Sequence, residues 1–99
     1  MDGRASISTD VLARYAADAA CDVPGVRGLV EGHLPRQRAV RVTDEDGEVA
    51  VELHVAVDWD ASIPDVGRGV QLSVRDYLVR MADLEPTRVD VVVAEIGPA

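Results

Sequence analysis

The chain has 99 residues, of which 47% are hydrophobic and 28% are charged, and its formal net charge is −8 at pH 7. This length fits one domain around one core, so we expect a single domain over residues 1–99 and no disordered chain. The acidic balance excludes a nucleic-acid partner, because phosphate binding needs a basic surface. It also disfavours direct docking on anionic lipid.

The compartment follows from the cysteine content and from the absence of long apolar runs. Cys21 is the single cysteine and has no partner for an internal disulfide, which fits a reducing compartment and predicts a cytoplasmic protein. Residues 1–30 lack a basic start followed by an apolar core, so we expect no secretory signal. No apolar run approaches ~20 residues, so we expect no direct membrane insertion.

The first elements predicted along the chain are a short strand at residues 3–7 and a helix. Ser8 or Thr9 can cap this helix, and Asp10 is favourable in its first turn. Apolar side chains then recur at helical spacing and predict its inner face: Val11, Leu12, Tyr15, Ala16, Ala19 and Val23.

A Pro-Gly pair predicts where this helix ends. Pro24 pushes Val23 out of the helical region, so the helix should end near Asp22. Gly25 can adopt a positive φ at the turn, and Val23 and Val26 can close over the bend. This stop therefore serves the fold, because it turns the helix back onto the sheet.

The middle of the chain predicts a hairpin. Residues 31–38 indicate a loop, residues 39–42 a strand, and residues 44–48 a turn with Asp46-Gly47 at its tip. The next strand has an alternating pattern over eleven residues, with one face buried and one face wet. Its buried face is predicted to hold Val49, Val51, Leu53, Val55, Val57 and Trp59, and its wet face Ala50, Glu52, His54, Ala56 and Asp58.

A second helix and a last strand complete the predicted fold. Ser62 can cap the helix, Pro64 suits its first turn, and Pro86 should end it. The inner face of the helix is expected to contain Val66, Val70, Val74, Tyr77, Leu78, Met81 and Leu84. Residues 88–96 form the last strand. The fold class is α+β, with two helices packed on one face of a small antiparallel-rich sheet in the order β-α-β-β-α-β.

Metal chemistry has little support in the sequence. Cys21, His33 and His54 share no ligand spacing, whereas a zinc site normally takes four ligands. Residues 58–62, "DWDAS", imitate the start of a calcium loop, but Ile63 occupies the sixth position, where the loop needs glycine. We expect no metal and no cofactor.

Catalytic patterns are equally weak, so we expect no enzyme. A nucleophile needs a nearby base, and Ser6, Ser8, Ser62 and Ser73 are explained by caps or by helix surface. The glycine spacing fits neither a Walker loop nor a dinucleotide loop, and all ten basic residues are arginine, so the Walker lysine is missing as well.

Two kinds of surface remain once the fold is accounted for. Leu72 and Val79 lie seven residues apart, opposite the inner stripe of the second helix; they are either stray apolar residues or the anchor pair of a protein contact. Val92, Ala94 and Ile96 should share the second face of the last strand, where a partner can cover them. The first helix has a smooth outer stripe, which reflects either helix propensity or close packing of another helix: Ala13, Ala17, Ala20 and Cys21.

These segments, taken in order, resemble the alkaline shock protein family of envelope stress response proteins. Residues 3–29, "GRASISTDVLARYAADAACDVPGVRGL", resemble the opening of that family, with its Ile-Ser segment, helix and Val-x-Gly-Val turn. Residues 49–96 are similar to the remainder, in which an alternating strand leads to an Ile-x-Asp-Val helix start and a Val-rich strand follows. Residues 31–47 are the least similar.

The resemblance implies a small cytoplasmic α+β domain without catalytic residues. Members tend to self-assemble, reach the membrane through a membrane-anchored partner, and serve cell-envelope homeostasis in Gram-positive bacteria. We therefore expect a protein-interaction module that contacts a protein partner or a second copy through Leu72, Val79, Val92 and Ile96. The alternative is a small-ligand regulatory module with a pocket between the second helix and the sheet, near Trp59.

Overall fold

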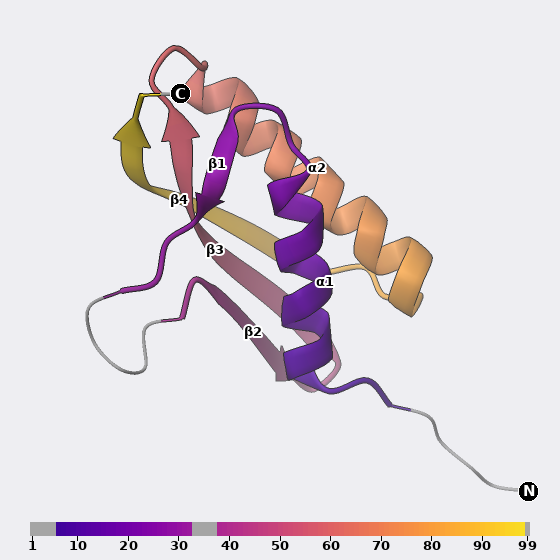
Figure 1. The fold of residues 1–99 in the computed structure, drawn as a ribbon. Coiled ribbons are helices and arrows are strands. Elements are labelled where there is room, and N and C mark those ends of the chain that lie inside the picture. Colours follow the sequence, from indigo (N-terminus) through magenta and orange to yellow (C-terminus); the bar gives the residue numbers. More distant parts are fainter. Residues whose placement is uncertain (1–5, 33–37, 99) are drawn as a thin grey trace, which may run out of the picture.

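The computed structural model describes residues 6–32 and 38–98, which form two helices and a four-stranded sheet (Figure 1). The elements follow in the order α1 (Thr9–Cys21), β1 (Val26–Leu29), β2 (Val40–Glu45), β3 (Glu48–Asp58), α2 (Ile63–Ala82) and β4 (Arg88–Gly97). The predicted α+β class, with both helices on one face of a mainly antiparallel sheet, is confirmed.

The element order differs from the prediction at its start. The expected strand at residues 3–7 lies partly outside the described residues, and Ser6 and Ile7 belong to no strand. A strand that the prediction did not include, β1 at Val26–Leu29, follows α1. Its sequence, "VRGL", is too short and too weakly alternating to be identified as a strand by periodicity.

The turn between α1 and β1 forms as the Pro-Gly pair predicts. Asp22 is the C-cap residue of α1, and Gly25 has a φ of +94°. The backbone N–H of Val26 donates to the carbonyl of Val23 at 3.1 Å and closes the bend. The carbonyl of Gly25 accepts from the N–H of Asp58 at 2.9 Å, which attaches the turn to the end of β3.

Strand β3 is the centre of the sheet. β1 and β2 pair with β3 antiparallel in successive segments: Val26–Leu29 opposite residues 55–57, and Val40–Glu45 opposite residues 48–53. They therefore share one edge of β3. β4 pairs with the other edge in parallel, as the α2 crossover requires. The predicted tip of the β2–β3 hairpin is confirmed, since Asp46 and Gly47 both have positive φ.

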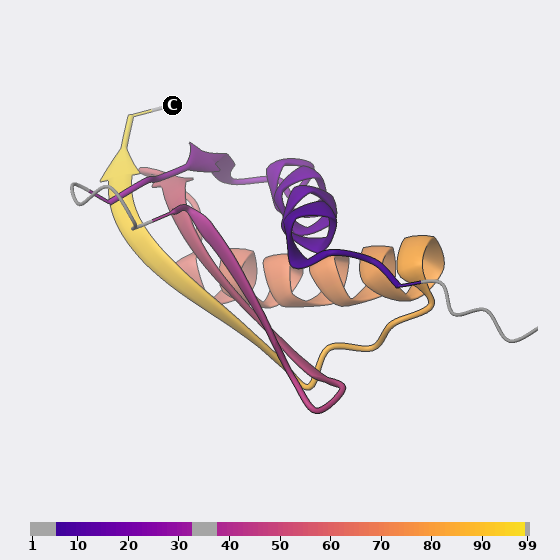
Figure 2. The same cartoon turned by 90° about the horizontal axis from the view of Figure 1, so that it is seen from below.

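The two helices cover the same face of this sheet, as Figure 2 shows from below. The core between them is built from small and branched side chains, with no buried polar or charged side chain among the described residues. It consists of Leu12, Ala16, Ala19, Ala20, Ala39, Val40, Val49, Val51, Leu53, Val55, Val57, Val66, Val70, Val74, Leu78 and Val89.

Helix α1 lies against both α2 and the sheet, so its alanine stripe is not an outer surface. Ala20 is fully buried, and Ala13 and Ala17 pack against the core. The predicted outer stripe is therefore wrong except at Cys21, which is exposed. The Oγ of Ser73 on α2 donates to the carbonyl of Ala19 at 2.9 Å. Ala19 belongs to the predicted inner face, so α2 does not pack along the alanine stripe; Ala13 and Ala17 instead lie near Leu29 and Ala39.

Three apolar residues predicted to be buried are exposed. Val11 lies in the first turn of α1 and is 37% exposed, and Met81 lies in the last turn of α2 and is 48% exposed, although Leu84 beyond it packs against the core. Trp59 follows the last residue of β3 and is 74% exposed, because the strand ends at Asp58 and the chain turns away. Alternation in sequence does not reveal where a strand stops.

Candidate interaction surface

The outer side of α2 carries the most exposed aliphatic side chain of the described residues. The helix begins at its Ser62 cap, whose hydroxyl accepts from the N–H of Asp65. Its buried stripe of Val66, Val70, Val74 and Leu78 faces the sheet and α1. Leu72 and Val79 therefore point away from the core, and they are 65% and 45% exposed. Two turns of helix separate them by about 10 Å.

Val92 lies on a different side of the molecule. It pairs with His54 of β3, whose side chain lies on the face of the sheet that no helix covers. The ring Nε2 of His54 lies 3.1 Å from a carboxylate oxygen of Glu52, so polar groups surround the 39% exposed Val92. Leu72 and Val92 cannot contact the same flat partner surface.

Ile96 does not share a face with Val92, which corrects the predicted row. The pairing between β3 and β4 shifts at a β-bulge, so Val93 lies beside Val55 but Glu95 lies beside Ala56. Ile96 then lies beside Val57, on the helix side of the sheet, and is 49% exposed near the end of the strand. The four predicted contact residues thus occupy three separate places.

Trp59 is an exposed apolar residue that the sequence analysis missed as a surface feature. It lies in the β3–α2 turn, and its backbone N–H donates to the carbonyl of Gly97 at 2.6 Å. This bond joins the turn to the end of β4, close in sequence to Ile96. Exposed tryptophan is characteristic of interaction surfaces, because it offers a large apolar area and one polar group. The sequence did carry a signal for this exposure, because Trp59 comes three residues before the Ser62 helix cap, where the strand has to end in a turn.

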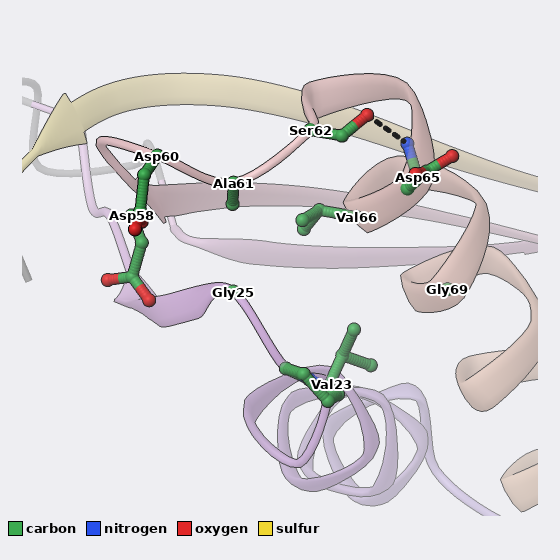
Figure 3. A pocket seen from close by; sticks show the side chains of 10 residues that line it. Val23, Gly25, Asp58, Asp60, Ala61, Ser62, Asp65, Val66 and Gly69 are labelled. Atoms are coloured by element: carbon green, nitrogen blue, oxygen red, sulfur yellow. Dashed lines mark hydrogen bonds between the residues drawn. The ribbon is translucent and has the colours of Figure 1, made fainter.

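A hollow of about 510 Å³ opens where the α1–β1 turn meets the start of α2 (Figure 3). Asp58 and Asp60 lie at one end of it, and Val23 and Val66 lie towards the other. Trp59 does not line it, so the predicted pocket exists in a different position from the one expected. The hollow is wide open, and Asp65 also lines it from the first turn of α2, apart from Asp58 and Asp60; three carboxylates suit a cationic group better than an anion.

The residues considered for metal or nucleophilic chemistry are not brought together. Within residues 6–32 and 38–98, no three His, Cys, Asp or Glu side chains gather in a metal-binding group; His33 lies outside these residues. Burial raises the pKa of the Cys21 thiol, and the carboxylates of Asp18 and Asp22 raise it further. A thiol of this kind is a poorer nucleophile at neutral pH.

Three of the four serine hydroxyls, those of Ser8, Ser62 and Ser73, are committed to structure. Ser8 and Ser62 accept from backbone N–H groups at the starts of α1 and α2, which confirms the predicted caps. Ser73 bonds to the backbone of α1 and is partly buried, so it is not a helix-surface residue. Neither helix in the described part of the chain is long and apolar enough to cross a membrane.

The fold and these surfaces define a small α+β domain whose accessible features are contact surfaces and open hollows. The model of the alkaline shock protein 23 family, described as having a cell envelope-related function, matches residues 1–98. The chain belongs to this family, so the resemblance seen in the sequence is confirmed.

One curated protein and several solved structures are similar to this chain, and the structures show its fold alone. The uncharacterized protein YqhY of Bacillus subtilis (strain 168) is 27% identical over 99 residues, covering 90% of this chain and 73% of that protein. Solved structures of MamM share the fold: a variant of the MamM CTD has a TM-score of 0.67 at 17% identity, covering 91% of this chain and 99% of that one. A second MamM variant has a TM-score of 0.68 at 17% identity, covering 93% and 100%.

Proposed function

We propose that this protein is a non-enzymatic protein-interaction module in the cell-envelope stress response or in envelope homeostasis. It acts in the cytoplasm, associates with a second copy or a membrane-anchored partner, and reaches the membrane through that partner. The observation that carries the proposal is the exposed Leu72 and Val79 pair on a helix whose opposite side is fully buried. The envelope-related family supports the setting.

The α2 pair is the best anchor because the fold does not need it. Leu72 and Val79 stand on a regular helix with a capped start, so their positions are fixed before any partner arrives. Rigid apolar side chains lose little conformational entropy on binding, which favours them as anchors. A specific interface buries about 1,600 Å² in total, so neighbouring residues of α2 and β4 must contribute as well.

The test is association of the full chain with and without the anchor pair. The double substitution Leu72→Asp with Val79→Asp should abolish self-association in light scattering, or capture of the native-host partner in pull-down with mass spectrometry. The matched control is Ile63→Asp with Met81→Asp, which changes the same helix and adds the same charge at exposed apolar positions. The proposal fails if the wild-type chain is monomeric at high concentration and the Leu72 and Val79 variant still captures its partner.

The hollow beside Asp58 and Asp60 favours a second candidate, a small-ligand regulatory module. Its volume of about 510 Å³ lies within the ~300–1,000 Å³ of typical ligand pockets. Trp59 is the single tryptophan of the chain and lies between the two lining aspartates, so its fluorescence reports on the site. Titration with cationic metabolites should then give a saturable change that Asp60→Asn removes. A linear response with every metabolite would eliminate this candidate.

A further inference from the structure

A groove of about 460 Å³ runs between α2 and the first residues of β4. Arg68 and Arg75 line it from the helix and Arg88 lines it from the strand, whereas Asp90 is the one carboxylate in its lining. The whole chain has 18 acidic and 10 basic residues. The groove therefore reverses the charge balance of the molecule, and it favours an anionic occupant.

The three arginines are held only by weak local ion pairs. Each pair is on the surface: Arg68–Asp65 at 3.1 Å, Arg75–Glu85 at 3.6 Å and Arg88–Asp90 at 2.9 Å. The arginine side chains are 69%, 43% and 70% exposed, respectively. Exposed pairs of this kind contribute little to stability, so the guanidinium groups can exchange these carboxylates for those of a partner at small cost.

The groove also offers features that only a peptide would use. Leu72, 65% exposed, lies in its lining among the arginines. Beside it, β4 pairs with β3 alone in the part of the chain that the structure describes, so its outer edge carries no strand. The side-chain amide of Gln71 already donates to the carbonyl of Val89 at 3.1 Å, so an added segment would bond to the edge of β4 beyond Val89. An extended segment can bond to a free edge of this kind.

We propose that this groove binds an extended acidic segment of a separate partner protein. Carboxylates of the segment contact Arg68, Arg75 and Arg88, and an apolar side chain between them packs on Leu72. The inference rests on the proposed function and specifies the chemistry of the partner. A nucleic acid or a lipid headgroup would use the arginines but leave Leu72 uncovered, and the net charge of −8 opposes both.

A labelled peptide tests the groove directly. The probe is a fluorescein-labelled ten-residue peptide of alternating Glu and Leu, titrated with the full chain and followed by fluorescence anisotropy at low ionic strength. A matched peptide carries Gln in place of Glu. The acidic peptide should bind saturably, the Gln peptide at least tenfold more weakly, and added salt should weaken the acidic peptide most.

Two double variants of the protein separate local contacts from net charge. Arg68→Gln with Arg75→Gln should weaken binding of the acidic peptide about tenfold. Arg14→Gln with Arg80→Gln removes the same charge from helix positions outside the groove and should leave binding within about twofold. Leu72→Ala should weaken binding about threefold, because it removes the apolar contact. Circular dichroism checks that each variant keeps its fold.

Three results would overturn the inference. The first is equal weakening by both double variants, which means that net charge alone attracts the peptide. The second is equal binding of the Glu and Gln peptides. The third is stronger, arginine-dependent binding of phosphatidylglycerol vesicles or a 20-nucleotide DNA strand. If any of these occurs while Leu72→Asp with Val79→Asp still abolishes association, the proposed function stands and only the acidic partner is lost.

Discussion

Helices α1 and α2 pack on the same face of the sheet, but their exposed sides carry different kinds of side chain. α1 is covered on two sides: Ser73 and Tyr77 of α2 contact it from one side, and the sheet contacts it from the other. Tyr15 and Tyr77 lie 5.7 Å apart between ring centroids, and this aromatic contact fastens the two helices together. α2 packs against α1 and against β4, and its outer side presents Leu72 and Val79.

The difference shows how two amphipathic helices of one domain can serve two purposes. On α1, alanine is a packing device, because a side chain of one carbon lets a neighbouring helix approach closely. On α2, larger branched residues fill the core, and the opposite side is left for other contacts. The exposed side of α1 carries charged residues such as Arg14 and Asp18, whereas the exposed side of α2 also carries Leu72 and Val79, so substitutions on the outer sides of the two helices should differ in kind.

The largest effect is expected within α2 itself, between its inner and outer leucines. Leu78 is fully buried and Leu72 is 65% exposed. Leu78→Ala should lower the free energy of unfolding by about 2–5 kcal/mol, because it leaves a cavity in the core. Leu72→Ala should change it by no more than about 0.5 kcal/mol. Urea denaturation measures both, and similar losses would contradict the division between the two sides.

The turn after α1 should be nearly as sensitive. A Cβ at Gly25 would lie 2.7 Å from the Cγ2 of Val66, and its φ is +94°. Gly47 has a similar φ of +82° but open space around it. Gly47→Ala should cost about 1–2 kcal/mol from backbone strain alone. Gly25→Ala should cost at least about 1 kcal/mol more, from the collision with α2. Thermal unfolding of both variants isolates the second cost, and equal melting temperatures would refute it.

Enlarging an alanine on α1 tests whether that helix is packed on both sides. Ala16 is fully buried, so Ala16→Leu should destabilise the fold by about 1–3 kcal/mol through overpacking. Arg14→Leu places the same side chain two residues earlier, on the exposed side of α1. That control should stay within about 0.5 kcal/mol of the wild type. A well-tolerated leucine at position 16 would mean that α1 is loosely held.

The smallest effect is expected at Cys21, the exposed end of α1. Partial burial and the carboxylates of Asp18 and Asp22 raise the pKa of its thiol. The folded chain should therefore react with iodoacetamide more slowly at pH 8 than the urea-unfolded chain. Asp18→Asn should lower the pKa and speed the reaction. Because the folded state holds this proton more tightly, the associated stability is present at neutral pH and is lost as pH rises through the folded-state pKa.

Local chemistry made several features predictable. Ser8 and Ser62 cap the helices as expected, because a hydroxyl beside an apolar periodic run satisfies free N–H groups. The Pro24-Gly25 turn forms where the backbone preferences of these residues require it. The exposure of Leu72 and Val79 also follows from helical periodicity. Each of these features depends on residues within a few positions of one another.

Other features depended on contacts distant in sequence and were missed. Trp59 continues the alternation of β3, but the strand stops at Asp58, where the turn bonds to the end of β4. Ile96 lies on the opposite face of β4 from Val92 because of a β-bulge, which only the pairing with β3 reveals. The arginine-lined groove joins α2 to β4, and no spacing along the chain brings Arg75 and Arg88 together.

The sequence by itself determined the α+β class, both helix starts, the end of α1, the hairpin and the family, because capping, periodicity and turn preferences act over a few residues. Only the structure decided that α2 ends at Ala82, with Asp83 as its C-cap, before the predicted end at Pro86. It also decided that β1 and β2 share one edge of β3 and which apolar residues remain accessible. Strand partners and covering layers are chosen among segments far apart in the chain, and their choice depends on the free energy of the whole packed arrangement.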